Sequence, residues 1–223
     1  MRRRLFVEAS LKYATGLLGV GLMLFLPAGS LGFWQGWLLM GTLFVPMFIA
    51  GVVLVVKSPE LLRKRLSAKE RNATERGVVK LSGLLFVASF VVAGLNWRYG
   101  WLLLPDWAVW VAAAILLLSY LAYAEVMREN AYLSRIVEVA KGQCVVDTGL
   151  YGVVRHPMYT ATTLLFLAMP IVLASPISFL VMLLYIPLII LRINDEEALL
   201  LRELEGYADY CQRVKYRLIP FVY

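Results

Sequence analysis

Two short polar clusters interrupt a strongly apolar chain, and both contain residue types that bind anions or sugars. In the first cluster Arg155, His156 and Pro157 follow one another. Proline restricts the residue before it and is favoured at the first position of a helix, so a helix is predicted to begin at Pro157. The unpaired N–H groups of that helix start, with the planar fork of Arg155, would suit a carboxylate or phosphate. The same residues could instead serve as interfacial anchors that cap a helix.

The second cluster lies where the last apolar stretch ends, and it contains Arg192, Glu196 and Glu197. Neighbouring residues of a helix point about 100° apart, so the two carboxylates cannot both face one pocket squarely. One of them could bind a ribose diol while the other pairs with a base or faces solvent. Arg192 lies at the junction with the membrane. A solvated helical face is the alternative interpretation of this cluster.

The composition shows what must hold these clusters in place. Of the 223 residues, 61% are hydrophobic and 17% are charged, against roughly 45–50% and 25% in ordinary globular domains. A soluble domain of this size buries only about 70% of the surface that its unfolded chain exposes, so it could not hide this much apolar area. Disorder is excluded too, because disordered segments are polar. The chain is therefore expected to be an integral membrane protein.

Five stretches contain no Asp, Glu, Lys, Arg or His, and a helix needs about 20 apolar residues to cross the hydrocarbon core. They are Tyr13–Gly29, Trp34–Val56, Leu81–Trp97, Trp107–Ala124 and Met158–Leu191. The last would be about 51 Å long as one helix, too long for one straight crossing. Pro170, Ser175 and Pro176 predict a break near its middle, giving two short helices in a hairpin. The predicted fold is all-α, a polytopic transmembrane bundle of five to six helices with a C-terminal helical hairpin.

The distribution of basic residues predicts the orientation of this bundle. With a cytoplasmic N-terminus, all of the 22 Lys and Arg residues except Arg98 fall on the cytoplasmic side, as the positive-inside rule requires. Both termini and the two polar clusters are then cytoplasmic. The first apolar run resembles a signal peptide, but a second span follows almost at once, so a retained first helix is preferred.

Several functional classes lose support from the same residues. The apolar stretches contain no ionisable group, which counts against an ion-coupled transporter. Cys144 and Cys211 form no CxxC motif, and the chain has one His, so no metal site is expected. The net charge of +7 comes from loops that flank the membrane. Topology and anionic lipids explain these bases, so no nucleic-acid partner is expected.

The ordered spacing of the two clusters resembles the isoprenylcysteine carboxyl methyltransferase family, within a wider group that includes the phospholipid N-methyltransferases. The first part of the pattern is Gln143…Thr148-Gly149-x-Tyr151-x-x-x-Arg155-His156-Pro157-x-Tyr159. The second part is Arg192…Glu196-Glu197-x-x-Leu200, then Tyr207-x-x-Tyr210-x-x-x-Val214, then Arg217-x-Ile219-Pro220. The resemblance covers roughly residues 120–223. It implies a C-terminal catalytic region, 111–223, preceded by generic transmembrane helices in 1–110.

This resemblance implies an integral membrane methyltransferase that uses S-adenosylmethionine in a cytoplasmic cofactor pocket. The residues implied to line the pocket are Gln143, Val145, Gly149, Leu150, Tyr151, Arg155, His156, Pro157, Tyr159, Glu196 and Glu197. Arg192 and Glu196 are the expected catalytic residues, and Tyr207 and Tyr210 would brace the tail over the pocket. The chain departs from the animal isoprenylcysteine enzymes in Asn194-Asp195, where theirs resemble a longer Glu run, and in its shorter length.

The acceptor is expected to be a lipophilic small molecule or a lipidated substrate that enters from membrane lipid. A prenylated thiol carboxylate, a phospholipid amine and a small lipophilic thiol or carboxylate are all compatible with the sequence. Two other functions remain open: an NADPH-dependent sterol-type membrane reductase, and a non-catalytic membrane scaffold. The sequence indicates no oligomeric state.

Overall fold

The computed structural model describes residues 2–67, 73–130, 132, 139–140 and 142–223, and every regular element within them is helical. The helices, in chain order, are α1 (Arg2–Ala28), α2 (Trp34–Lys57), α3 (Pro59–Ser67), α4 (Ala73–Tyr99), α5 (Asp106–Glu129), η1 (Gly149–Gly152), α6 (Pro157–Val172), α7 (Pro176–Leu183), α8 (Tyr185–Glu203) and α9 (Tyr207–Arg213).

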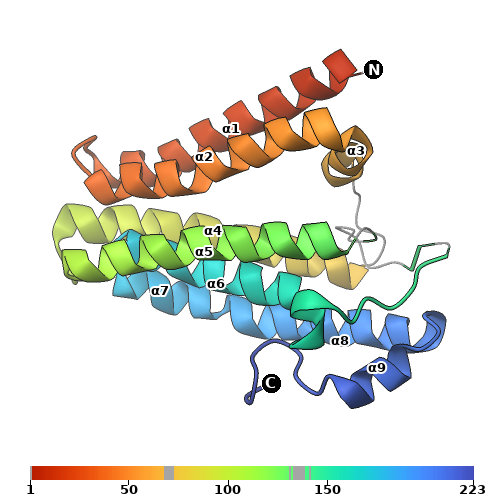
Figure 1. Cartoon of the computed structure of the whole chain (residues 1–223). Helices are drawn as coiled ribbons and strands as arrows, with labels where there is room; N and C mark the ends of the chain where they lie inside the picture. Colours follow the sequence, from red (N-terminus) through yellow and green to blue (C-terminus); the bar gives the residue numbers. More distant parts are fainter. Residues whose placement is uncertain (1, 68–72, 131, 133–138, 141) are drawn as a thin grey trace.

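Within the described part of the chain, five segments are long and apolar enough to cross a membrane: Leu5–Ala28, Trp34–Lys57, Arg76–Tyr99, Asp106–Glu129 and Pro176–Glu203. The long helices lie side by side as a bundle, with the N-terminus, α3 and α9 towards one end (right in Figure 1). The α1–α2 and α4–α5 connections lie towards the other end. The predicted polytopic helical bundle is confirmed, and the chain has the character of a multi-pass integral membrane protein.

The C-terminal hairpin is formed by α6 on one side and α7 with α8 on the other. The 16 residues of α6 make a helix of about 24 Å, shorter than the hydrocarbon core. The break lies in the predicted region between Pro170 and Pro176, and α6 continues through Pro170 to Val172. Pro176 begins α7, and the hydroxyl of Ser175 caps that helix by accepting a hydrogen bond from the Ser178 N–H at 3.2 Å.

Close packing of the long helices makes a firm platform for the hairpin. A Cβ added at Gly94 of α4 would lie 2.6 Å from the carbonyl oxygen of Leu24 in α1, so these two backbones approach too closely for any larger residue. The buried hydroxyls of Ser89 and Ser178 lie 2.7 Å apart and join α4 to α7. Helix α5 packs along α6. The hairpin is therefore held against the long helices α4 and α5.

Residues 214–223 form what we call the C-terminal strap, which follows α9 and runs back to the start of α6. The N–H of Arg155 donates to the Tyr216 carbonyl at 2.9 Å, and the N–H of His156 donates to the Arg217 carbonyl at 2.9 Å. One turn later, the Thr160 hydroxyl donates to the Leu218 carbonyl at 2.7 Å. The strap thus satisfies two backbone N–H groups next to the start of α6, where a helix leaves such groups unpaired.

Candidate functional site

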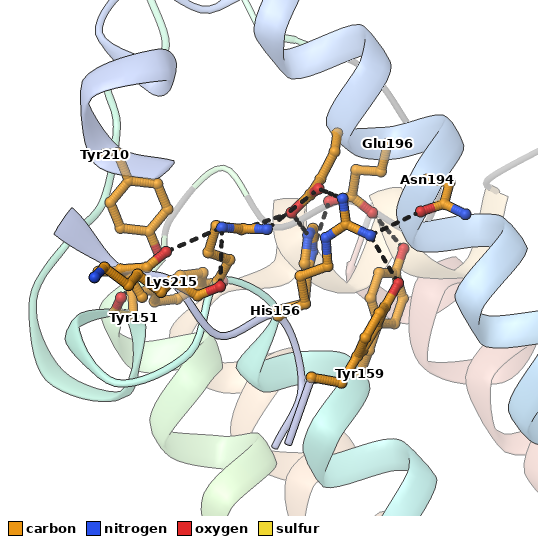
Figure 2. Close-up of polar contacts among 12 residues, drawn as sticks. Tyr151, His156, Tyr159, Asn194, Glu196, Tyr210 and Lys215 are labelled. Atoms are coloured by element: carbon orange, nitrogen blue, oxygen red, sulfur yellow. Dashed lines mark hydrogen bonds and ion pairs between the residues drawn. The ribbon is translucent and has the colours of Figure 1, made fainter. Parts of the chain in front are cut away.

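A buried carboxylate, Glu197 of α8, joins three parts of the chain at the end of the bundle. Its side chain is 7% exposed, and one oxygen accepts a hydrogen bond from Arg155 Nε at 2.7 Å. The same oxygen lies 3.1 Å from His156 Nε2. Its other oxygen lies 2.9 Å from Nη2 of Arg217 in the C-terminal strap. Figure 2 shows these contacts converging beside His156. Helix α8, the start of α6 and the strap are therefore tied together by one ion cluster.

The guanidinium of Arg155 forms its hydrogen bonds with other groups of the protein. Besides its bond to Glu197, its Nη1 donates to the carbonyls of Val214 at 3.1 Å and Lys215 at 3.3 Å. These contacts bind α6 to the beginning of the strap. Arg155 also lines the cavity described below, but its hydrogen bonds show that it mainly holds the wall of that cavity in place.

Glu196, the neighbour of Glu197, faces a different set of groups. Its carboxylate accepts a hydrogen bond from the hydroxyl of Tyr159 in α6, and the two side chains converge in Figure 2. The same hydroxyl accepts a hydrogen bond from Arg192 Nε at 2.9 Å. The two carboxylates therefore have different surroundings, as expected for adjacent helical residues: Glu197 is enclosed by cations, and Glu196 borders the cavity.

An open cavity of about 830 Å³, counting solvent at its mouth, lies above the start of α6. Its walls come from the end of α5, the segment before η1, the start of α6, α8 and α9. The lining residues are Asn130, Tyr132, Gln143, Cys144, Val145, Val146, Tyr151, Arg155, His156, Pro157, Met158, Tyr159, Arg192, Glu196, Leu200, Leu204, Tyr207 and Tyr210.

Most of the residues singled out from the sequence meet at this cavity. They are Gln143, Val145, Tyr151, Arg155, His156, Pro157, Tyr159, Arg192 and Glu196. Three others are not among the lining residues: Glu197 lies in the ion cluster, and Gly149 and Leu150 belong to η1. Gly149 has a positive φ of 56°, and a Cβ there would lie 3.2 Å from the Glu129 carboxyl carbon. Its part in the site is to let the chain turn closely past α5.

Several lining residues carried no signal that singled them out in the sequence: Asn130, Tyr132, Cys144, Val146, Met158 and Leu204. Asn130 is the residue that ends α5, and its side-chain amide donates to the Tyr151 hydroxyl at 2.9 Å. A polar residue directly after an apolar helix was the one available sign of its role. The apolar members have no such sign, because any membrane helix contains similar residues.

Tyrosine rings form much of the cavity wall. Burial raises the pKa of Tyr151 to about 12, and burial likewise raises the pKa of Tyr210 well above its usual value. The Tyr210 hydroxyl donates to the Tyr151 carbonyl at 2.7 Å. The hydroxyl of Tyr207 is buried and faces the thiol of Cys211. The cavity thus presents aromatic faces and neutral donors around one carboxylate.

A second, mostly apolar groove begins where the first cavity ends. It has a volume of about 1,290 Å³ with its open side included. Its walls come from α4, α5, α6 and α8, through Val78, Val79, Ser82, Gly83, Phe86, Tyr123, Met158, Tyr159, Thr162, Phe166, Tyr185, Ile189 and Arg192. Met158, Tyr159 and Arg192 line both spaces. We call the first space the outer cavity and the second the apolar groove, and a shared wall of three side chains separates them.

Comparison with known proteins finds a family match that covers less than half of the chain. Residues 107–202 match the isoprenylcysteine carboxyl methyltransferase (ICMT) family. The matched segment covers nearly all of α5 and of the hairpin and includes both polar clusters, so the resemblance predicted from the sequence is confirmed over this segment.

One curated relative has a different activity in its name. The Delta(14)-sterol reductase TM7SF2 of Mus musculus is 32% identical over 90 residues, which are 39% of this chain and 22% of the reductase. The chain thus spans about a fifth of the length of that relative. The similarity shows related sequence over a limited region, and the reductase activity is a property of the mouse protein.

Proposed function

We propose that the chain is an S-adenosylmethionine-dependent methyltransferase whose lipophilic acceptor reaches the site from the bilayer. The observation that carries this proposal is the pair of spaces that share Met158, Tyr159 and Arg192. A polar cofactor in the outer cavity and an apolar acceptor in the groove would meet at that wall. The excess of basic residues beside this end of the bundle favours a cytoplasmic cavity and cytoplasmic termini.

The residues of the outer cavity fit the parts of this cofactor. Glu196 offers a carboxylate for a ribose diol, and the tyrosine rings offer faces for the adenine base and for the sulfonium cation. Gln143 and Asn130 add neutral polar groups. Arg155, His156 and Glu197 would hold the floor of the cavity through the ion cluster.

When bound, S-adenosylmethionine would supply a methyl group on a sulfonium, whose transfer is an in-line displacement that needs no metal. The contribution of the protein would be to align the acceptor and exclude water. Alignment alone is worth up to about 7–11 kcal/mol in favourable cases. The apolar groove would hold the acceptor tail, while Arg192 at its inner end would orient an anionic or carboxylate head. Such a head is compatible with an isoprenylcysteine-type carboxylate.

The direct experiment is to incubate the purified chain with S-adenosylmethionine labelled in its methyl group and a total membrane extract, and then to identify the labelled product. We expect label in an organic-soluble product whose formation depends on the protein. Release under mild alkali would identify a methyl ester, whereas N- or S-methyl products would keep their label. The absence of protein-dependent label from every lipid and lipoprotein fraction would contradict the proposal.

The similarity to the mouse sterol reductase supports a second candidate, an NADPH-dependent membrane reductase. That cofactor carries three phosphates, which require several cations. Of the residues that line the outer cavity, the cationic ones are Arg155, already bonded to Glu197, and Arg192. Calorimetry with S-adenosylhomocysteine and with NADPH separates the candidates. Heat of binding for NADPH alone would favour the reductase, and binding of neither would favour a non-catalytic scaffold.

A further inference from the structure

One side chain of the shared wall, Tyr159, forms hydrogen bonds with both charged residues nearby, Glu196 and Arg192. Tyr159 is 6% exposed, and its hydroxyl contacts Glu196 of the outer cavity and Arg192 of the apolar groove. A guanidinium only donates and an ionised carboxylate only accepts. The directions of both hydrogen bonds are therefore fixed: the hydroxyl accepts from Arg192 and donates to Glu196.

The ring of Tyr159 is itself held on both sides. The His156 ring lies against it with centroids 5.6 Å apart and an interplanar angle of 26°, and His156 is fixed by Glu197. On the groove side, the Arg192 guanidinium carbon lies 5.8 Å from the Tyr159 ring centroid, within the range of a cation–π contact. The ion cluster thus restrains the His156 ring, the His156 ring packs on Tyr159, and Tyr159 contacts Arg192 in the shared wall.

From these contacts we propose that Tyr159 is a positioning residue for the acceptor, acting by holding Arg192 in the orientation that receives an anionic head group. This inference rests on the proposed function, because it assigns Arg192 to the acceptor. Loss of the hydroxyl would remove one of the contacts that order the Arg192 side chain, and ordering such a side chain anew on binding weakens the binding by up to about tenfold. Tyr159 therefore sets the preference of the groove for an anionic over a neutral head.

The test uses Tyr159→Phe, which keeps the ring, the stack on His156 and the shared wall while it removes both hydroxyl contacts. The probes are labelled palmitate, an anionic amphiphile, and labelled hexadecanol, its neutral counterpart, bound to the full chain in detergent micelles. We expect the Kd of palmitate to rise about fivefold to tenfold, and that of hexadecanol to change less than twofold. An equal loss for both probes, or no loss for palmitate, would overturn the inference.

A double-mutant cycle shows whether the hydroxyl acts through Arg192 or through Glu196. On an Arg192→Ala background, Tyr159→Phe should have less than a twofold effect on palmitate, because the group that it positions is gone. A full effect on that background would show that the hydroxyl acts by another route. S-adenosylhomocysteine is titrated into the same preparations. If wild-type protein binds none of it, the proposed function fails; if it binds normally and palmitate is insensitive to Tyr159→Phe, only the positioning role fails.

Discussion

Removing the charge of Glu197 tests whether the ion cluster holds the site together. Glu197→Gln keeps the size of the side chain but leaves two guanidiniums, those of Arg155 and Arg217, facing a neutral amide. The Arg155 and Glu197 side chains are 10% and 7% exposed, and breaking a buried pair of this kind costs about 3–5 kcal/mol. Arg217, with a side chain that is 32% exposed, is screened by water and adds less. We therefore expect the lower end of that range, about 3 kcal/mol.

For a chain of this length, about 3 kcal/mol corresponds to a decrease in Tm of at least about 6 °C. Thermal unfolding in detergent, followed by tryptophan fluorescence, measures it. The matched control is Glu203→Gln, an exposed position on the same helix, which should shift Tm by less than about 1 °C. If Glu197→Gln unfolded within about 2 °C of wild type, the cluster would not join α8 to α6 and the strap in the way described.

Three further changes probe the two spaces separately. A Cβ at Gly83 meets no atom within 4 Å, so Gly83→Leu should fill the groove and raise the KM for the acceptor, while the affinity for S-adenosylhomocysteine measured by calorimetry should not change. The control is Gly77→Leu, an equally open position outside the groove. Equal effects of the two variants on KM would contradict the assignment of the groove to the acceptor. Arg192→Ala should lower kcat/KM for an anionic acceptor about 30-fold, the loss of a charged hydrogen bond of about 2 kcal/mol; full retention would remove its proposed role. Cys144 is exposed at the cavity wall, so S-adenosylhomocysteine should slow its labelling by maleimide. Cys211 should react slowly with or without the ligand, because burial raises the pKa of its thiol and leaves less thiolate at neutral pH. Unprotected Cys144 would place the ligand elsewhere.

Those parts of the architecture that depend on a single physical rule could be predicted from the sequence. The absence of charge over long stretches predicts the membrane helices, and Pro157 begins α6 as the helix-start rule predicts. The hairpin turn was harder to place, since Pro170 stays inside α6. A proline within the last turn of a helix disturbs few hydrogen bonds, and the capping pair Ser175 and Pro176 set the actual boundary.

The site could be predicted as a set of residue types, but their partners could not. The sequence singled out Arg155 and Glu197 as groups that could meet a ligand, and it could not show that they pair with each other across the fold. Nor could it show that Arg217, in the strap, completes the cluster. Such pairings depend on where distant segments meet, and nothing in the local spacing encodes them. Once Arg155 and Glu197 are paired, Glu196 and Tyr159 are left to face the cavity.

The C-terminal strap also imposes an order on how the protein is made. The apolar helices can insert one after another as they leave the ribosome, because each satisfies its own backbone. The start of α6 must wait, since its partners Tyr216 and Arg217 are synthesised only after α7, α8 and α9. A nascent chain is thus integrated in the bilayer before the start of α6 is fixed by the strap. The final arrangement of this end of the bundle therefore forms in one late step, and a chain interrupted before the strap would be inserted without it.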